Sequence, residues 1–103
     1  MKYNKMVRDL IPDEINQSGK KCSFRIADDS ERLHYLHDKL LEECNELIES
    51  DSLEEIADVL EVIEAIEKEL GYKQNDVLSA KESKRSRKGS FSKGVILLSV
   101  EDK

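Results

Sequence analysis

The chain of 103 residues has few cysteines and no long apolar run. Two cysteines, Cys22 and Cys44, are too few for a disulfide framework, and with His34 and His37 they match no familiar zinc-binding spacing. A membrane-spanning helix needs about 18 or more consecutive apolar residues, and none are present. Charged residues occupy the N-terminus, where a signal peptide would be apolar. We therefore expect a cytoplasmic protein that engages no membrane.

Apolar residues are scarce for a chain of this length. They make up 38% of the sequence, against 39% charged residues. A monomer of this size buries only about 60 to 65% of its unfolded surface. We therefore expect a single domain over residues 1–103 whose thin core is completed by self-association, as a homodimer or a homotetramer.

Basic residues are also scarce in the middle of the chain. Residues 26–76 hold four basic and 17 acidic groups, a net charge of −13, whereas residues 1–25 carry +3 and residues 77–103 carry +4. A nucleic acid polymer needs Lys and Arg along its phosphates, so the central block argues against one. Its natural partner is a cation. The basic ends could hold phosphates beside that cation, or could neutralise the acidic block within the fold.

Two segments show apolar residues at every third or fourth position, which is the pattern of an amphipathic helix. They are Leu33, Leu36, Leu40, Cys44 and Leu47 in the first, and Ile56, Val59, Leu60, Ile63, Ile66 and Leu70 in the second. The first helix is predicted to start near Ser30 and the second to stop at Gly71, with Asp51 and Ser52 between them. We also predict short helices over 11–15 and about 76–86, and a strand over the β-branched run 94–100.

Two helices joined by so short a turn form an antiparallel hairpin, which cannot close a core alone. The expected fold is therefore all-α: a helix hairpin with short flanking helices and a small C-terminal strand. Dimerisation would complete a four-helix-type core. The apolar arc around Val59, Val62, Ile63 and Ile66 is wider than one partner helix would cover, so we expect the second subunit to pack there.

Four acidic residues are spaced so that they can face one another across this hairpin. Glu43 and Glu46 point about 60° apart on the flank of the first helix, and Glu55 and Asp58 do so on the second. Two like charges about 4 Å apart repel by roughly 4 kcal/mol at an effective dielectric of 20, so such a patch needs a counterion. Carboxylate oxygens suit Mg²⁺, with Mn²⁺ as a substitute.

Two other interpretations of these acidic residues stay open. Ser52 and Glu55 have the spacing of a capping box, in which Glu55 would only hold the start of its helix, although Asp51 with Glu54 would form an equivalent box and leave Glu55 free. The four carboxylates could also belong to a solvated acidic helix face. The basic residues, in turn, could simply balance the acidic block.

Three motifs in order resemble a known family. Glu42-Glu-Cys-Asn-Glu46 followed by Glu55-Ile-Ala-Asp58 resembles the E-E-x-x-E, spacer, E-x-x-D pattern of the MazG-like, all-α nucleoside triphosphate pyrophosphohydrolase superfamily. Residues 3–12, YNKMVRDLIP, look like the YNKLVRDKIP opening of its phosphoribosyl-ATP pyrophosphohydrolase-like subgroup, and residues 84–91 are similar to the K-x-x-x-R-G-G-F closing motif. The resemblance covers nearly the whole chain.

The resemblance implies a Mg²⁺-dependent enzyme that converts a nucleoside triphosphate or related nucleotide to the monophosphate and pyrophosphate, in a housecleaning role. It implies Mg²⁺ ligands and catalytic residues at Glu43, Glu46, Glu55 and Asp58. Phosphate contacts are implied at Lys5, Arg8, Lys84 and Lys88, and Arg87 is added because it lies beside them.

The chain departs from the family pattern in two places. Only eight residues separate Glu46 from Glu55, a short spacer, and the closing motif has Lys88 and Ser90 where Arg and Gly are usual. Lysine offers a point charge without the two-pronged geometry of arginine. The alternatives are a phosphoribosyl-ATP pyrophosphohydrolase and a catalytically idle helical dimer that binds a nucleotide or a protein.

Overall fold

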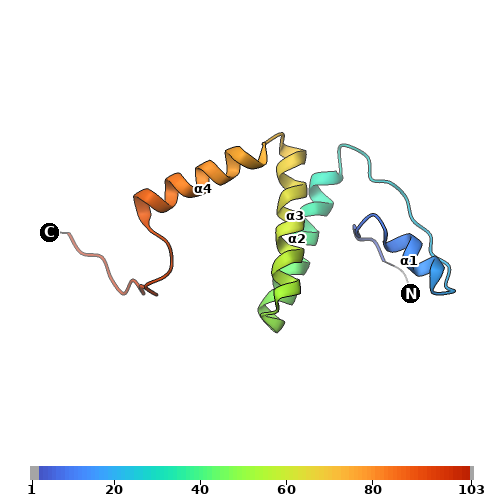
Figure 1. The fold of residues 1–103 in the computed structure, drawn as a ribbon, viewed down its shortest axis with the longest axis horizontal. Coiled ribbons are helices and arrows are strands. Elements are labelled where there is room, and N and C mark those ends of the chain that lie inside the picture. The colour runs from blue at the N-terminus through green and yellow to red at the C-terminus, as the bar shows by residue number, and fades with distance from the viewer. Residues whose placement is uncertain (1–2, 103) are drawn as a thin grey trace. The chain divides into compact units, whose positions relative to one another are not determined.

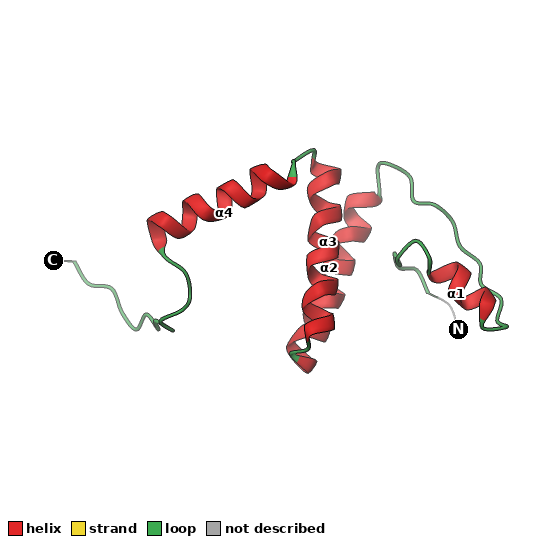
Figure 2. Cartoon of the chain, in the orientation of Figure 1, coloured by secondary structure: helices red, strands yellow, loops and turns green. Residues whose placement is uncertain are grey.

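The computed structural model describes residues 3–102 and contains, within them, helices and no strand (Figure 2). The helices are α1 (Ile11–Gln17), α2 (Arg32–Ser50), α3 (Leu53–Leu70) and α4 (Gln74–Lys88). The predicted all-α class is confirmed. The chain divides into two compact units, Met1–Tyr72 and Lys73–Lys103. Among the described helices, none is both long enough and apolar enough to cross a bilayer.

A two-residue connection joins α2 to α3 and makes them antiparallel neighbours (Figure 1). Asp51 ends α2 in the left-handed conformation, with φ 50°, and its N–H donates to the Leu47 carbonyl at 2.7 Å. Ser52 is then the N-cap of α3, because its hydroxyl accepts a hydrogen bond from the Glu55 N–H at 3.2 Å. The predicted hairpin is therefore formed with almost no loop.

The other helix ends follow local chemistry closely. Gly71 ends α3 with φ 81°, its N–H bonded to the Lys68 carbonyl and the Tyr72 N–H bonded to the Glu67 carbonyl, which is the Schellman arrangement. The start of α2 lies two residues beyond the predicted Ser30, and the carboxylate of its N-cap, Glu31, accepts a hydrogen bond from the Asp28 N–H at 3.0 Å. Local capping thus sets where α3 stops, whereas α2 begins without a side-chain cap at its N-cap residue.

The hairpin core is as thin as the composition implies. Within residues 3–102, Leu36 on α2 and Val62 on α3 are the buried apolar side chains, and Glu43 is buried beside them. Glu43 follows Leu36 by seven residues and Glu55 precedes Val62 by seven, so each carboxylate lies on the same helix face as a buried apolar residue. One layer of the α2–α3 seam is therefore acidic.

The exposed apolar face of α3 differs from the predicted arc. Val62 is buried in the hairpin, and Val59 and Ile66 are half-buried, so of the predicted residues only Ile63 is exposed. The seam with α2 uses one flank of the apolar arc, so Val62 lies inside the hairpin, and the packing of a second subunit on this arc stays a prediction. The exposed stripe, with side chains between 36% and 83% exposed, consists of Leu53, Ile56, Leu60, Ile63 and Leu70.

The predicted strand over 94–100 is not formed within the described residues. The segment has no strand assignment, and the backbone of 95–102 makes no backbone hydrogen bond in the part of the chain that the structure describes. Its apolar side chains are between 77% and 89% exposed. The β-branched composition favours an extended conformation, but a strand also needs a neighbour to pair with.

Candidate metal centre

Three carboxylates from the two hairpin helices converge at the acidic layer. Glu43 comes from α2, and Glu55 and Asp58 come from the first turns of α3. One oxygen of each lies within 4.8 Å of the others. We call Glu43, Glu55 and Asp58 the acidic cluster. Oxygens around one Mg²⁺ lie at most about 4.2 Å apart, so small side-chain rotations would bring these three onto a single ion.

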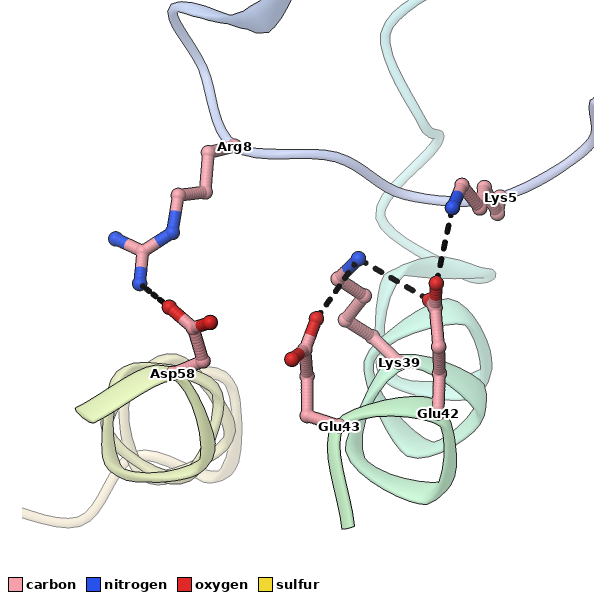
Figure 3. Close-up of polar contacts among 6 residues, drawn as sticks. All are labelled: Lys5, Arg8, Lys39, Glu42, Glu43 and Asp58. Atoms are coloured by element: carbon pink, nitrogen blue, oxygen red, sulfur yellow. Dashed lines mark hydrogen bonds and ion pairs between the residues drawn. The ribbon is translucent and has the colours of Figure 1, made fainter. Parts of the chain in front are cut away.

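Glu43 is the most deeply buried member of the cluster. Its side chain is only 9% exposed, and its Oε2 is buried without a hydrogen-bond partner. Its Oε1 accepts from the Lys39 Nζ at 3.2 Å (Figure 3). A buried carboxylate oxygen without a partner carries a desolvation cost, which a bound cation would offset.

The structure also shows whether the side chain of Glu55 caps the start of α3 or is free to join the acidic cluster. The Ser52 hydroxyl accepts from the Glu55 N–H, but the Ser52 N–H donates to the Ser50 hydroxyl at 3.4 Å instead of to the Glu55 carboxylate. The side chain of Glu55 is thus not part of a capping box. Its Oε2 is buried without a hydrogen-bond partner, as in Glu43.

The protonation of Glu55 reflects this environment. Burial, the adjacent carboxylate of Glu43 and the negative charges of Glu46 and Asp58 raise the pKa of Glu55 to about 7. Without a cation Glu55 is therefore mostly protonated below about pH 7 and about half protonated at neutral pH.

Glu46 lies beside the cluster but is not one of its three converging oxygens. It is exposed on α2, whereas Glu43, three residues earlier, is turned into the seam. The adjacent carboxylate of Glu43, with its negative charge, raises the pKa of Glu46. Glu46 is therefore close enough for the charge of the cluster to change its pKa, and it remains a predicted ligand.

The N-terminal segment passes over the hairpin with Arg8 pointing at Asp58 of the acidic cluster and Lys5 pointing at the neighbouring Glu42 (Figure 3). Arg8 bonds to Asp58 at 2.7 Å and Lys5 bonds to Glu42 at 2.9 Å. Both basic side chains are about half exposed, so phosphate oxygens can reach them from solvent. The structure brings Lys5 and Arg8 to the site, where they already balance part of its charge.

Lys39 is a site residue that the sequence interpretation did not single out. Its Nζ lies 3.1 Å from Glu42 and 3.2 Å from Glu43, and its side chain is only 16% exposed. Burial lowers the pKa of Lys39, but the hydrogen bonds to Glu42 and Glu43 outweigh that effect and raise it overall. The signal was present in the sequence, because Lys39 precedes Glu43 by four residues, the spacing of a helical ion pair.

The predicted closing-motif contacts belong to the second unit. Lys84, Arg87 and Lys88 lie at the C-terminal end of α4 and are exposed. A shallow hollow of about 340 Å³ follows them, lined by Lys88, Gly89, Ser90, Ser92, Lys93 and Val95. The acidic cluster is formed without these residues, entirely within the first unit.

Comparison of the chain with protein-family models, with curated proteins and with solved structures found no match. The interpretation of the site therefore depends on the geometry of its own residues.

Lys39 is expected to stabilise the metal-free protein. Replacing it by Met removes the cation that pairs with the buried Glu43, and loss of such a partner costs about 1 to 3 kcal/mol. Lys39→Met should therefore lower the free energy of unfolding in chelator, measured by urea denaturation, and Mg²⁺ should recover part of the loss. Lys68→Met, an exposed change on α3, is the matched control; equal losses for the two variants would contradict a specific role for Lys39.

The raised pKa of Glu55 gives the metal-free protein a defined pH dependence. The folded state holds the Glu55 proton up to about pH 7, whereas an unfolded carboxyl releases it near its ordinary value of 4.5. Folding therefore binds a proton between these values, and stability falls as pH rises through this window. Thermal melts from pH 5 to 8 should show a shallower fall for Glu55→Gln than for Glu54→Gln, its exposed neighbour. The same slope in both variants would show that Glu55 is not the group whose titration lowers stability.

Proposed function

We propose that the chain is a Mg²⁺-dependent nucleotide pyrophosphohydrolase that converts a nucleoside triphosphate, or a related nucleotide, to the monophosphate and pyrophosphate. The observation that carries the proposal is the buried Oε2 of Glu43, which lies without a hydrogen-bond partner where two further carboxylates converge. The likeness of the three sequence motifs to the MazG-like superfamily supports the same function.

The chemistry of the donor set favours a hard cation. All three converging atoms are carboxylate oxygens, and no sulfur or nitrogen ligand is among them. Oxygen-only sites suit Mg²⁺ and Mn²⁺, and few protein ligands leave room for waters and substrate phosphates. Glu43, Glu55 and Asp58 would hold the ion, with Glu46 near enough to join them. Bound there, Mg²⁺ would stabilise charge on phosphate oxygens and activate a water.

Basic residues next to the acidic cluster could bind the phosphates of the substrate. Arg8 and Lys5 lie at the rim of the acidic layer, each already engaged with a carboxylate. A metal at the cluster would compete with Arg8 for Asp58, and the freed guanidinium would then be available to a phosphate oxygen. Lys84, Arg87 and Lys88 remain proposed phosphate contacts on the strength of the closing motif.

Self-association is part of the proposal. The exposed stripe on α3 repeats at intervals of three and four residues from Leu53 to Ile63, with Leu70 a further seven residues along, which is the pattern of a helix that packs against another helix. Two hairpins that bury this stripe against each other would complete a four-helix core. The proposed assembly is therefore a homodimer built on α3, or a homotetramer containing it.

Hydrolysis is tested by incubating the purified protein with Mg²⁺ and a panel of canonical and modified nucleotides, with phosphoribosyl-ATP included, and measuring pyrophosphate release. Glu55→Gln and Asp58→Asn should each reduce the rate about 100-fold or more, because each removes a charged ligand, whereas Glu54→Gln should leave it nearly unchanged. Calorimetric titration with Mg²⁺ alone measures metal binding separately from hydrolysis. Metal binding without turnover of any nucleotide in the panel would contradict the hydrolase and leave a metal-binding protein, and no metal binding at all would end the proposal.

The dimer is tested on the exposed stripe of α3. A charge in the middle of an apolar helix interface would be buried without a partner, so Leu60→Glu should weaken self-association at least tenfold in sedimentation equilibrium. Ile26→Glu makes the same kind of change at an exposed apolar residue outside the helices and should have little effect. A wild-type chain that stays monomeric at high concentration would contradict the proposal directly.

A further inference from the structure

The C-terminal segment carries the most exposed apolar run in the second unit. Residues 95–98 and Val100 are between 77% and 89% exposed, and the described backbone of 95–102 makes no backbone hydrogen bond. An exposed apolar segment whose backbone N–H and C=O groups make no backbone hydrogen bond can serve as a template for strand pairing. The question is which partner its side chains fit.

The charges at the two ends of the run identify the partner. Lys93 precedes the run and Glu101 follows it, with no charged residue between them. In a parallel pair of identical segments, each of these residues would face its own copy, and like charges directly opposite are destabilising. In an antiparallel pair Lys93 of each chain faces Glu101 of the other. The segment is thus complementary to itself in one direction only.

We propose that residues 93–101 pair with the same residues of a second copy of this chain, as a two-stranded antiparallel ribbon centred on Leu97. In this register Leu97 faces Leu97 of the other copy, Ile96 faces Leu98, and Val95 faces Ser99. The ribbon involves different residues from the α3 interface, but it rests on the proposed self-association of two chains.

The register also separates the two faces of the ribbon. Successive side chains of a strand point to opposite faces, so Ile96, Leu98 and Val100 of both copies gather on one face. The other face carries Val95, Leu97 and Ser99 with a Lys93–Glu101 pair at each end. The ribbon therefore has one wholly apolar face to bury and one face that tolerates solvent. Because an isolated two-stranded ribbon is marginally stable in water, it forms as part of a larger association of two chains.

Disulfide trapping in the full-length chain tests this register. In a background with Cys22→Ser and Cys44→Ser, Leu97→Cys places two thiols directly opposite each other and should form a covalent dimer under mild oxidation. Leu98→Cys is the matched control, because its Cα lies about 8 Å from its own copy in this register, beyond the limit of about 7 Å for a disulfide. Mixing Ile96→Cys chains with Leu98→Cys chains should restore cross-linking. Equal yields at 97 and 98 would overturn the register, and no cross-link at 97 would overturn the ribbon.

A charge swap gives a second readout that does not depend on cysteine. Lys93→Glu and Glu101→Lys should each weaken self-association, by about tenfold for the two pairs of a symmetric ribbon, and the double variant should restore it. Lys93 and Glu101 are too far apart along one extended segment to pair within a chain, so restoration requires two copies. A double variant as weak as the single variants would refute antiparallel pairing. Far-UV circular dichroism checks that each variant keeps its helices.

Discussion

The burial of a carboxylate at a position that packs α2 against α3 is the constraint on which the rest of the first unit depends. Glu43 lies one heptad from Leu36, where a second aliphatic residue would have extended the core. The hairpin gives up apolar packing at that layer and takes on the cost of like charges from Glu55 and Asp58. A fold with so little apolar surface to bury keeps such a layer only where the charges meet a cation.

Lys39 and Arg8 provide that cation in the protein alone. Lys39 pairs with Glu43, which lies one turn later in the same helix. Arg8 pairs with Asp58 from the N-terminal segment that precedes α1. The arrangement explains why the chain separates its charges so strongly along the sequence. The positive N-terminal segment is held over the negative hairpin by ion pairs, and within the described residues neither Arg8 nor Lys5 is buried. Because these ion pairs are open to solvent, Arg8 and Lys5 can leave their carboxylates and bind other anions.

Features set by neighbouring residues could be predicted from the sequence. Ser52 and Gly71 act on the backbone within a few residues, so the hairpin and the end of α3 followed from local chemistry. The convergence of Glu43, Glu55 and Asp58 also followed, because helix geometry fixes the directions of side chains.

The faces of α2 and α3 that become buried depend on packing and could not be predicted from the sequence. The rotation of each helix about its axis decides that Glu43 is buried and Glu46 exposed, and that Val62 rather than Leu60 meets α2. That rotation is set by which apolar residues find partners, and periodicity alone describes only a wide arc. The run over 94–100 shows the same limit, since its composition specifies an extended conformation but not the neighbour that would make it a strand.

The two-residue connection between α2 and α3 has a consequence for the order of events in folding. Because Asp51 and Ser52 are the only residues between the helices, the three carboxylates come together within a stretch of 16 residues, Glu43 to Asp58. Closing so short a loop has a small entropic cost, and contacts this local form early and fast. If these contacts form early, repulsion within the acidic layer would raise the barrier to hairpin formation. Divalent ions in the surrounding solution would act on the rate of folding as well as on the stability of the finished site.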